Sequence, residues 1–305
     1  MNKVWSSKMN TAAENYAQLT AVKATAALLF EVAATPKPGL VDRHNTGAHT
    51  DMDIALFQKS SLTVAPYFYE FVRYGTENSD KAPGTLLADS RHIGIEAEAA
   101  MLQATQGVNT HKGAVFSLGI MCMACGWIEG RHEAGHGPEE PGLSLQQVCA
   151  QIARPAMKDF DGVTMENART AGQRLYAKYG ITGVRGEAAA GFPAVFACSL
   201  PRMRELQQKG FNLNDAGILC LVDIMGRLID TNVIHRSSYE AAEEIRARMQ
   251  KLREGEIENK NYVQILEELD QEFITKHISP GGSADLLAMT YFLYSMEQPS
   301  VNFRE

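Results

Sequence analysis

Three cations of this chain stand in segments that could hold phosphate groups. Lys112 precedes Gly113 at the start of a predicted helix, where free N–H groups and the helix dipole favour a bound anion. Arg185 lies in a glycine-rich segment, where the backbone can approach a ligand while the guanidinium binds phosphate bidentately. Lys37 lies between two prolines, on a stiff segment that suits an orienting cation. Each is equally well explained as a solvated side chain, so the chemistry must be argued from several segments together.

Acidic residues stand at helix ends where a metal ion could accompany a phosphate. The segment SPGGSADLL places Gly281, Gly282 and Ser283 before an apolar helix, and their N–H groups could cradle phosphate. Asp285, in the first turn, would repel a polyphosphate unless Mg²⁺ bridged the two. Asp230 is predicted to end another helix, where its carboxylate meets the negative end of the dipole unless a metal ion or a ribose hydroxyl relieves it. Ordinary helix capping and a solvent-facing turn are the alternatives.

Two glutamates could take up a proton. The helical spacing of Ile95, Met101 and Leu102 predicts that Glu98 lies on the apolar stripe of its helix. Burial raises the pKa of a carboxyl and an adjacent cation lowers it, so Glu98 could be a general base or half of a structural ion pair. Glu187 belongs to the glycine-rich segment, where an exposed charge pair is the plainer interpretation.

Two short motifs carry little weight. The letters HEAGH, from His132 to His136, match HExxH, but the surrounding glycines and prolines oppose the helical turn that zinc ligation needs. Cys122 and Cys125 form a CxxC pair inside an apolar helix, which is typical of core side chains. A zinc hydrolase acting through the two histidines is therefore a distant alternative.

Helices must position these residues, because helical periodicity recurs throughout and alternating β-branched runs are nearly absent. We predict an all-α fold, a single compact domain over residues 1–305 with a flexible surface loop at 129–142. About eleven helices are expected, over 12–34, 52–74, 85–105, 112–128, 144–153, 164–179, 187–209, 215–230, 237–254, 260–276 and 283–297.

The composition excludes several classes of protein. The 305 residues are 45% hydrophobic and 21% charged, which excludes collagen-like and disordered chains. The net charge of −7 provides no field that would attract nucleic acid or an anionic membrane. The five cysteines are an odd number, no cationic leader is visible, and the longest apolar stretch is too short and interrupted to cross a bilayer. We expect a cytoplasmic protein that binds neither nucleic acid nor membrane.

Four polar segments together resemble one known family. TPKPGLVDRHNTGAHTDMD, GVNTHKGAVFSLG, GVRGEAAAGFP and SPGGSADLLAMTYFL, in this order, are similar to segments of the triphosphoribosyl-dephospho-coenzyme A synthases. The resemblance extends over nearly the whole chain. His235 and Arg236 carry less weight, because two serines follow where the family pattern often has glycines.

The resemblance implies an all-α pentosyltransferase that uses ATP and 3′-dephospho-coenzyme A. The 2′-hydroxyl of the acceptor attacks the anomeric carbon of ATP, adenine leaves, and the triphosphate stays on the transferred sugar. The product is the precursor of the citrate lyase or malonate decarboxylase prosthetic group. Inversion from a β-nucleoside to an α linkage implies a single displacement.

The resemblance also implies roles for the polar residues. Asp42, Glu98 or Glu187 would be the base, and His111 would donate to adenine or bind phosphate. Asp230 and Asp285 would hold Mg²⁺. The residues expected to bind substrate or phosphate are Lys37, Asn45, Asn109, Lys112, Arg185, Gly281, Gly282 and Ser283. The protein could pair as a homodimer, and the alternative function is that of a non-catalytic nucleotide-binding or coenzyme-binding protein.

Overall fold

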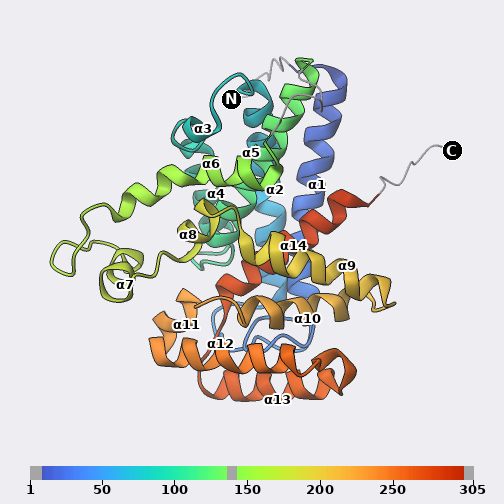
Figure 1. The fold of residues 1–305 in the computed structure, drawn as a ribbon, viewed down its shortest axis with the longest axis vertical. Coiled ribbons are helices and arrows are strands. Elements are labelled where there is room, and N and C mark those ends of the chain that lie inside the picture. The colour runs from blue at the N-terminus through green and yellow to red at the C-terminus, as the bar shows by residue number, and fades with distance from the viewer. Residues whose placement is uncertain (1–8, 136–142, 299–305) are drawn as a thin grey trace.

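The computed structural model describes residues 9–135 and 143–298. Every regular element in those ranges is a helix, which confirms the all-α prediction (Figure 1). The α-helices are α1 (Thr11–Ala33), α2 (Ile54–Glu77), α3 (Pro83–Asp89), α4 (Arg91–Ala104), α5 (Lys112–Glu133), α6 (Leu145–Ala153), α7 (Ala171–Tyr179), α8 (Gly183–Ala189), α9 (Leu200–Gln208), α10 (Leu213–Met225), α11 (Thr231–Arg236), α12 (Tyr239–Glu254), α13 (Tyr262–Thr275) and α14 (Gly281–Glu297). A 3-10 helix at Arg154–Phe160, a π-helical turn at Val195–Ser199 and a 3-10 turn at Ile257–Asn259 complete them.

Most predicted helices are confirmed to within a few residues, but two are interrupted. The helix expected over 85–105 is two helices, α3 and α4, because the backbone at Ser90 leaves helical geometry. The helix expected over 187–209 breaks after α8, where Gly191 and Phe192 have φ of 79° and 53°. Positive φ cannot continue a right-handed helix. These two breaks, together with the short helix α11 that was not predicted, account for the larger number of helices.

Two further boundaries differ from the prediction. The helix expected over 164–179 begins only at α7, whose N-cap Thr170 accepts from the N–H of Gln173. Helix α5 runs on to Glu133, so the predicted loop at 129–142 begins later than expected. Residues 136–142 of that loop, and with them His136 of the HExxH match, lie outside the described residues.

Helices α2 and α5 pack with their backbones in direct contact. A Cβ at Gly75 of α2 would lie 2.1 Å from the carbonyl oxygen of Met123, and one at Gly126 of α5 would lie 1.9 Å from that of Val72. Only glycine allows this approach, which fixes the position of α5 against its neighbour. The residues at the start of α5 are thereby held in place for the site described below.

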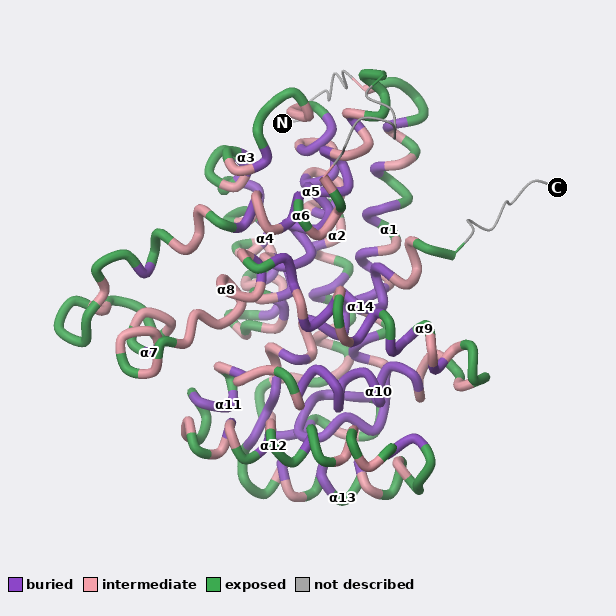
Figure 2. The backbone as a smooth tube through the Cα atoms, viewed as in Figure 1, coloured by how far each residue is buried: buried purple, intermediate pink, exposed green. Residues whose placement is uncertain are grey.

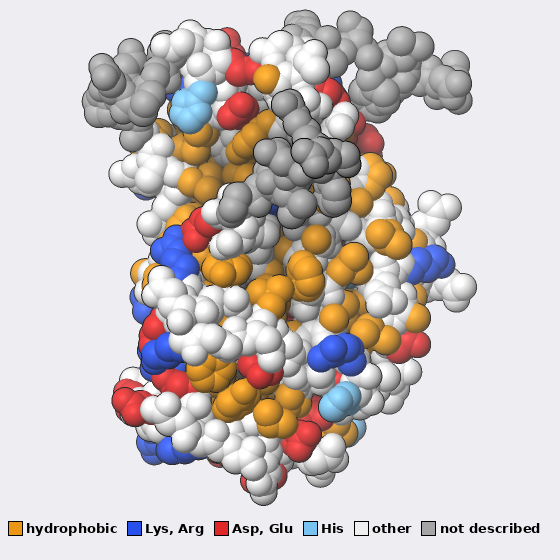
Figure 3. All heavy atoms as spheres, turned by 90° about the vertical axis from the view of Figure 1, so that its right-hand side faces the viewer, with side chains coloured by type: hydrophobic (Ala, Val, Ile, Leu, Met, Phe, Trp, Pro, Cys, Tyr) orange, Lys and Arg blue, Asp and Glu red, His pale blue; other side chains and the backbone are white. Residues whose placement is uncertain are grey.

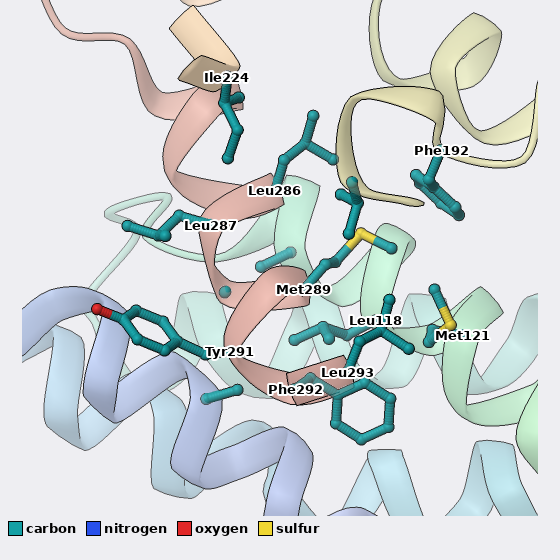
Figure 4. Close-up of a cluster of buried hydrophobic side chains, with 14 of the residues drawn as sticks. Leu118, Met121, Phe192, Ile224, Leu286, Leu287, Met289, Tyr291, Phe292 and Leu293 are labelled. Atoms are coloured by element: carbon teal, nitrogen blue, oxygen red, sulfur yellow. The ribbon is translucent and has the colours of Figure 1, made fainter. Parts of the chain in front are cut away.

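The core lies where α14 meets α5 and α10. Figure 4 shows Leu286, Met289 and Phe292 of α14 among side chains that include Leu118 of α5 and Ile224 of α10, and all of these are buried. Figure 2 shows that burial is continuous through these central helices, while α7, α12 and α13 expose one side. A helix that is apolar on all sides is typical of such a core.

Helix α5 is long and apolar enough to cross a membrane by length and composition. However, 78% of its apolar 18-residue window is buried inside the protein, as expected of a core helix. It is the single helix of that kind among the described residues.

Hydrophobic side chains are also spread over the surface drawn in Figure 3. Helix α1, toward that side in Figure 1, carries three exposed apolar residues, Leu19, Val22 and Phe30. Val22 is the most exposed of them, at 64%. Their spacing of three and eight residues places them along one side of the helix.

Candidate active site

One cavity of about 1190 Å³ collects most of the residues predicted from the sequence. It exceeds the roughly 300–1,000 Å³ of ordinary small-molecule pockets, so it has room for two nucleotides. The predicted residues that line it are Lys37, Glu98, Asn109, His111, Lys112, Arg185, Glu187, Asp230, Gly281, Gly282 and Asp285. Segments separated by more than two hundred residues therefore meet in one place.

Asp285 lies against the first turn of α5. Its carboxylate accepts a hydrogen bond from the N–H of Ala114, and a Cβ at Gly113 would lie 2.0 Å from its Oδ2. The helix start that was predicted to receive phosphate thus already meets a protein carboxyl group. Burial, with the nearby carboxylates of Glu31 and Asp230, raises the pKa of Asp285 well above its ordinary value.

Lys37 does not reach freely into the cavity, because it is paired. Its side chain is 1% exposed and forms an ion pair with the carboxylate of Glu31. Glu31 also borders the cavity. The Lys37 ammonium donates a second hydrogen bond to the carbonyl oxygen of Glu31, at 2.7 Å. Burial raises the pKa of Glu31, while Lys37 opposes the shift.

Asp230 holds two helix starts together, which corrects the expectation that it ends a helix. Helix α10 ends at Met225, and Asp230 is the N-cap of α11, accepting from the N–H of Asn232 at 2.9 Å. Its other oxygen accepts from the N–H and the hydroxyl of Ser283, at 2.8 and 2.9 Å. Both contacts lie at positive helix ends, so its local position is favourable.

Ser283 is consequently not available as a phosphate ligand. It is fully buried, and its polar groups are used by Asp230. Gly281 and Gly282 do border the cavity. A Cβ at Gly282 would lie 3.2 Å from the Asp230 carboxylate, so this glycine permits the close approach of that side chain.

Lys112 begins α5, as predicted, and faces Glu98 of α4. The two side chains form an ion pair, and Lys112 is 59% exposed on its side chain. Asn109 accepts from the Lys112 N–H at 3.2 Å and so helps to begin the helix. The expected position of Glu98 on the apolar stripe is wrong, because the buried face of α4 consists of Ile93, Ala97 and Met101. Glu98 borders the cavity instead.

Arg185 and Glu187 both lie on the short helix α8. The Arg185 guanidinium forms an ion pair with Asp159, Nε to Oδ2 at 3.1 Å, and is 39% exposed on its side chain. Glu187 accepts from the N–H of Ala194 at 2.7 Å. Burial raises the pKa of Glu187, while that hydrogen bond and Arg227 oppose the shift.

His111 is buried in the cavity wall with one ring nitrogen engaged. Its Nδ1 lies 2.7 Å from the hydroxyl of Ser60, and Thr110 donates to the same hydroxyl at 2.6 Å. Its Nε2 has no hydrogen-bond partner among the described residues. Burial, and to a lesser extent Lys37, lowers the pKa of His111 to about 3.

Asp42 and Asn45 do not line this cavity but border a separate, smaller one beside Asp270. Asp42 accepts from the Thr35 hydroxyl and from the N–H groups of Lys37, His44 and Asn45. Asn45 donates to Asp270 at 2.7 Å. Both side chains fold the loop that presents Lys37, so their polar groups are already used.

The structure gives no metal cage among the residues it describes. No three histidine, cysteine, aspartate or glutamate side chains are grouped so that they could hold a metal ion in those ranges. The donors that are present, above all Asp285, suit Mg²⁺, which commonly takes one or two carboxylates together with substrate phosphates.

The cavity has a polar end and an apolar end along α5. Lys112 and Gly113 line the polar end, and Met123 lines the wall eleven residues later, about 16 Å along a helix. The apolar side chains that line the cavity with Met123 are Leu28, Phe71, Leu87, Phe116 and Ile120. Gly94 of α4 faces it with open space, because a Cβ there would meet only the Phe71 ring, at 3.9 Å.

Two residues of the site were missed in the sequence. Glu31 follows Ala24, Ala27 and Leu28 at spacings of seven, four and three residues, so it continues the buried face of α1. A carboxylate on such a face needs a partner, and that signal was available. Ser60 carries no comparable signal, because it is one of two adjacent serines in an amphipathic helix.

Comparison with known proteins places the chain in a family. Residues 17–303 match the model of the ATP:dephospho-CoA triphosphoribosyl transferases. Proteins named 2-(5''-triphosphoribosyl)-3'-dephosphocoenzyme-A synthase, the first of them with the prefix "probable", are similar over most of their length. One from Pectobacterium carotovorum subsp. carotovorum is 42% identical, covering 88% of this chain and 86% of its own. One from Escherichia fergusonii is 38% identical, and the match covers 88% of this chain and 87% of that protein.

No solved structure gives a significant match. The family match spans all four segments singled out in the sequence and the helices that bring them to one cavity. This chain therefore belongs to the ATP:dephospho-CoA triphosphoribosyl transferase family.

Proposed function

We propose that this protein transfers the triphosphoribosyl group of ATP to the 2′-hydroxyl of 3′-dephospho-coenzyme A and releases adenine. Family membership supports this reaction. The observation that carries the proposal is the convergence of Lys112, Arg185 and Asp285, from three distant segments, on a cavity of about 1190 Å³. Incubation with both substrates tests it, since free adenine must appear in step with consumption of ATP.

The triphosphate occupies the polar end of the cavity in this proposal. Lys112 and Arg185 neutralise its charge, because both border the cavity and keep part of their side chains exposed. Their present partners, Glu98 and Asp159, are partly exposed carboxylates, which phosphate oxygens can replace. Lys37 contributes only at longer range, because Glu31 already pairs with it.

Mg²⁺ fits the polar end when phosphate is bound. Asp285 would hold it, since this carboxylate borders the cavity among other acidic groups that a cation would compensate. When bound, the ion would supply charge neutralisation to the triphosphate. Asp230 is not assigned to the metal, because both of its oxygens accept hydrogen bonds from backbone N–H groups.

Glu187 is the base for the acceptor hydroxyl in this proposal. Of the three carboxylates considered from the sequence, Asp42 does not line this cavity, and Glu98 lies beside Lys112, where the proposal places the triphosphate and not the acceptor hydroxyl. Glu187 borders the cavity and has no ion-pair partner at contact distance among the described residues, and burial raises its pKa toward the range in which a carboxylate accepts protons efficiently.

The apolar end would receive the pantetheine arm of the acceptor. Methylene and dimethyl groups of that arm match the hydrocarbon wall, while its amides can meet the backbone at the break between α3 and α4. Gly94 keeps this end open at a mid-helix position, where glycine costs about 1 kcal/mol relative to alanine.

Two expectations about the whole protein stay proposals. The five cysteines are free thiols, which supports a reducing cytoplasm as its location. A homodimer would bury the exposed apolar side chains of α1, Leu19, Val22 and Phe30. Analytical sedimentation tests this pairing: the unaltered protein should be a dimer and Val22→Asp a monomer. A monomer in both cases would contradict the proposed homodimer.

A further inference from the structure

We infer that a chain of two hydroxyl groups, Thr110 and Ser60, fixes His111 as the neutral imidazole with its proton on Nε2, and that this N–H donates a hydrogen bond to a ring nitrogen of the departing adenine. The first half rests on geometry alone. The second half rests on the proposed function, and the experiments below separate the two.

The direction of the hydrogen-bond chain sets the tautomer. Thr110 donates to the Ser60 oxygen at 2.6 Å, so the Ser60 proton is free to point toward His111 Nδ1 at 2.7 Å. The reverse arrangement, with a proton on Nδ1, would leave the Ser60 proton without an acceptor in a fully buried position. Leaving a buried donor unpaired costs about 1–3 kcal/mol. Ser60 therefore donates to Nδ1, and the imidazole proton lies on Nε2.

The neighbouring serine shows that this use of Ser60 is specific. Ser61 donates its hydroxyl to the carbonyl oxygen of Phe57, one turn earlier, at 2.9 Å. That is the usual bond of a serine inside a helix. Ser60 makes its side-chain hydrogen bonds with Thr110 and His111 instead.

Within the described part of the chain, the second ring nitrogen of His111 is left without a partner in the cavity wall. His111 is 2% exposed and borders the cavity, yet its Nε2 has no partner among the described residues. The Phe57 ring meets the imidazole edge to face, with centroids 5.0 Å apart, which fixes its orientation. Burial and Lys37 keep the ring neutral at physiological pH, so it donates a hydrogen bond without giving up a proton.

Such a donor suits the bond that breaks. The acceptor O2′–C1′ bond forms while the C1′–N9 bond breaks, and its electron pair goes to adenine. The hydroxyl proton passes to the base, and adenine finally takes one proton from solvent. Negative charge on the departing ring spreads to N3 and N7, which accept hydrogen bonds. A donor at either nitrogen therefore stabilises the transition state more strongly than it stabilises the ground state with ATP bound.

Nitrogen NMR of the free protein tests the tautomer. With ¹⁵N-labelled histidine, the signal lost in His111→Gln identifies His111 among the eight histidines. We expect a protonated Nε2 and an unprotonated Nδ1, unchanged from about pH 5 to about pH 8, where an ordinary histidine titrates. Ser60→Ala should change this signal, and Ser61→Ala should not. A proton on Nδ1, or titration near pH 6.5, would overturn the inference.

Kinetics test the role toward adenine. His111→Asn should lower kcat by about 10²-fold, as loss of a transition-state donor does. His111→Gln, whose amide N–H₂ can replace Nε2–H, should retain more activity than His111→Asn. Ser60→Ala should lower kcat by about tenfold with an unchanged KM for ATP, and Ser61→Ala should match the unaltered protein.

Equal activity of Ser60→Ala and Ser61→Ala would refute the positioning role. If the unaltered protein releases no adenine, the proposed reaction is wrong. The NMR experiment tests the tautomer of His111 independently of that outcome.

Discussion

The carboxylate of Asp285, at the start of α14, lies against the backbone of Gly113, at the start of α5. A Cβ at position 113 would approach Oδ2 to 2.0 Å, and the next N–H, that of Ala114, donates to this carboxylate. The contact joins the starts of α5 and α14, two helices of the core, at the edge of the cavity. It also places an acidic side chain where two segments had each been expected to receive phosphate.

Asp285 and Asp230 should respond differently to substitution. Asp285→Asn should raise the Mg²⁺ concentration for half-maximal activity by at least about tenfold, because one carboxylate ligand is lost. Asp230→Asn should leave this concentration unchanged but lower the free energy of unfolding by about 1–3 kcal/mol, since it disturbs hydrogen bonds at two helix starts. Removal of Mg²⁺ with EDTA should abolish activity reversibly, and activity in EDTA would refute the metal assignment.

Lys112 should matter for turnover and not for folding. Lys112→Ala should lower kcat/KM for ATP by about 10²-fold through loss of charge pairing with the triphosphate. Its side chain is 59% exposed, so the thermal unfolding temperature should barely change. Lys81→Ala is the matched control, because Lys81 pairs with Asp89 on the surface. Equal rates for the two variants would remove Lys112 from the site.

The sequence predicted the helical class and the segments of the site, because both depend on local patterns. Periodicity located α1, α2 and α12, and Lys112 beside Gly113 marked the start of α5, whereas α8 begins at Gly183, four residues before the predicted helix. Gly191 and Pro193 did signal an interruption at Phe192, because the residue before a proline disfavours helical geometry, but the positive φ of Phe192 is imposed by packing. Helix continuity across this position was therefore overestimated.

Side-chain partners were the least predictable part. The buried face of α4 was predicted wrongly at Glu98. Ile95, which was assigned to the same buried face, is 59% exposed and lines the cavity, not the core. Asp42 was a reasonable base by type, but its oxygens are used by its own loop. The bond between Asp230 and Ser283 spans 53 residues, and no local pattern encodes it.

The pH profile should report Glu187. Burial raises its pKa above the ordinary glutamate value of 4.5, and only the ionised form can accept the hydroxyl proton. Activity should therefore fall as the pH decreases through this raised pKa, giving an acid limb of kcat/KM above pH 4.5. Glu187→Gln should lose about 10²–10⁴-fold in kcat and the limb with it. Glu96→Gln is the control, because Glu96 is exposed. If Glu187→Gln kept the acid limb of kcat/KM, another group would be the base.

The apolar end of the cavity should select the acceptor. ADP has the ribose and diphosphate of dephospho-coenzyme A without the pantetheine arm, so the unaltered protein should strongly prefer dephospho-coenzyme A in kcat/KM. Gly94→Leu would fill the space beside Phe71 and should reduce this preference at least about tenfold, with little change in the KM for ATP. An unchanged preference would place the arm elsewhere.

The reaction itself is tested most directly by the products formed from ATP and 3′-dephospho-coenzyme A. Chromatography should detect free adenine, equal in amount to the ATP consumed, together with a coenzyme product that carries the added triphosphoribosyl group. Stabilisation by ATP without turnover would indicate a binding protein, and formation of ADP or pyrophosphate in place of adenine would contradict the proposed transfer.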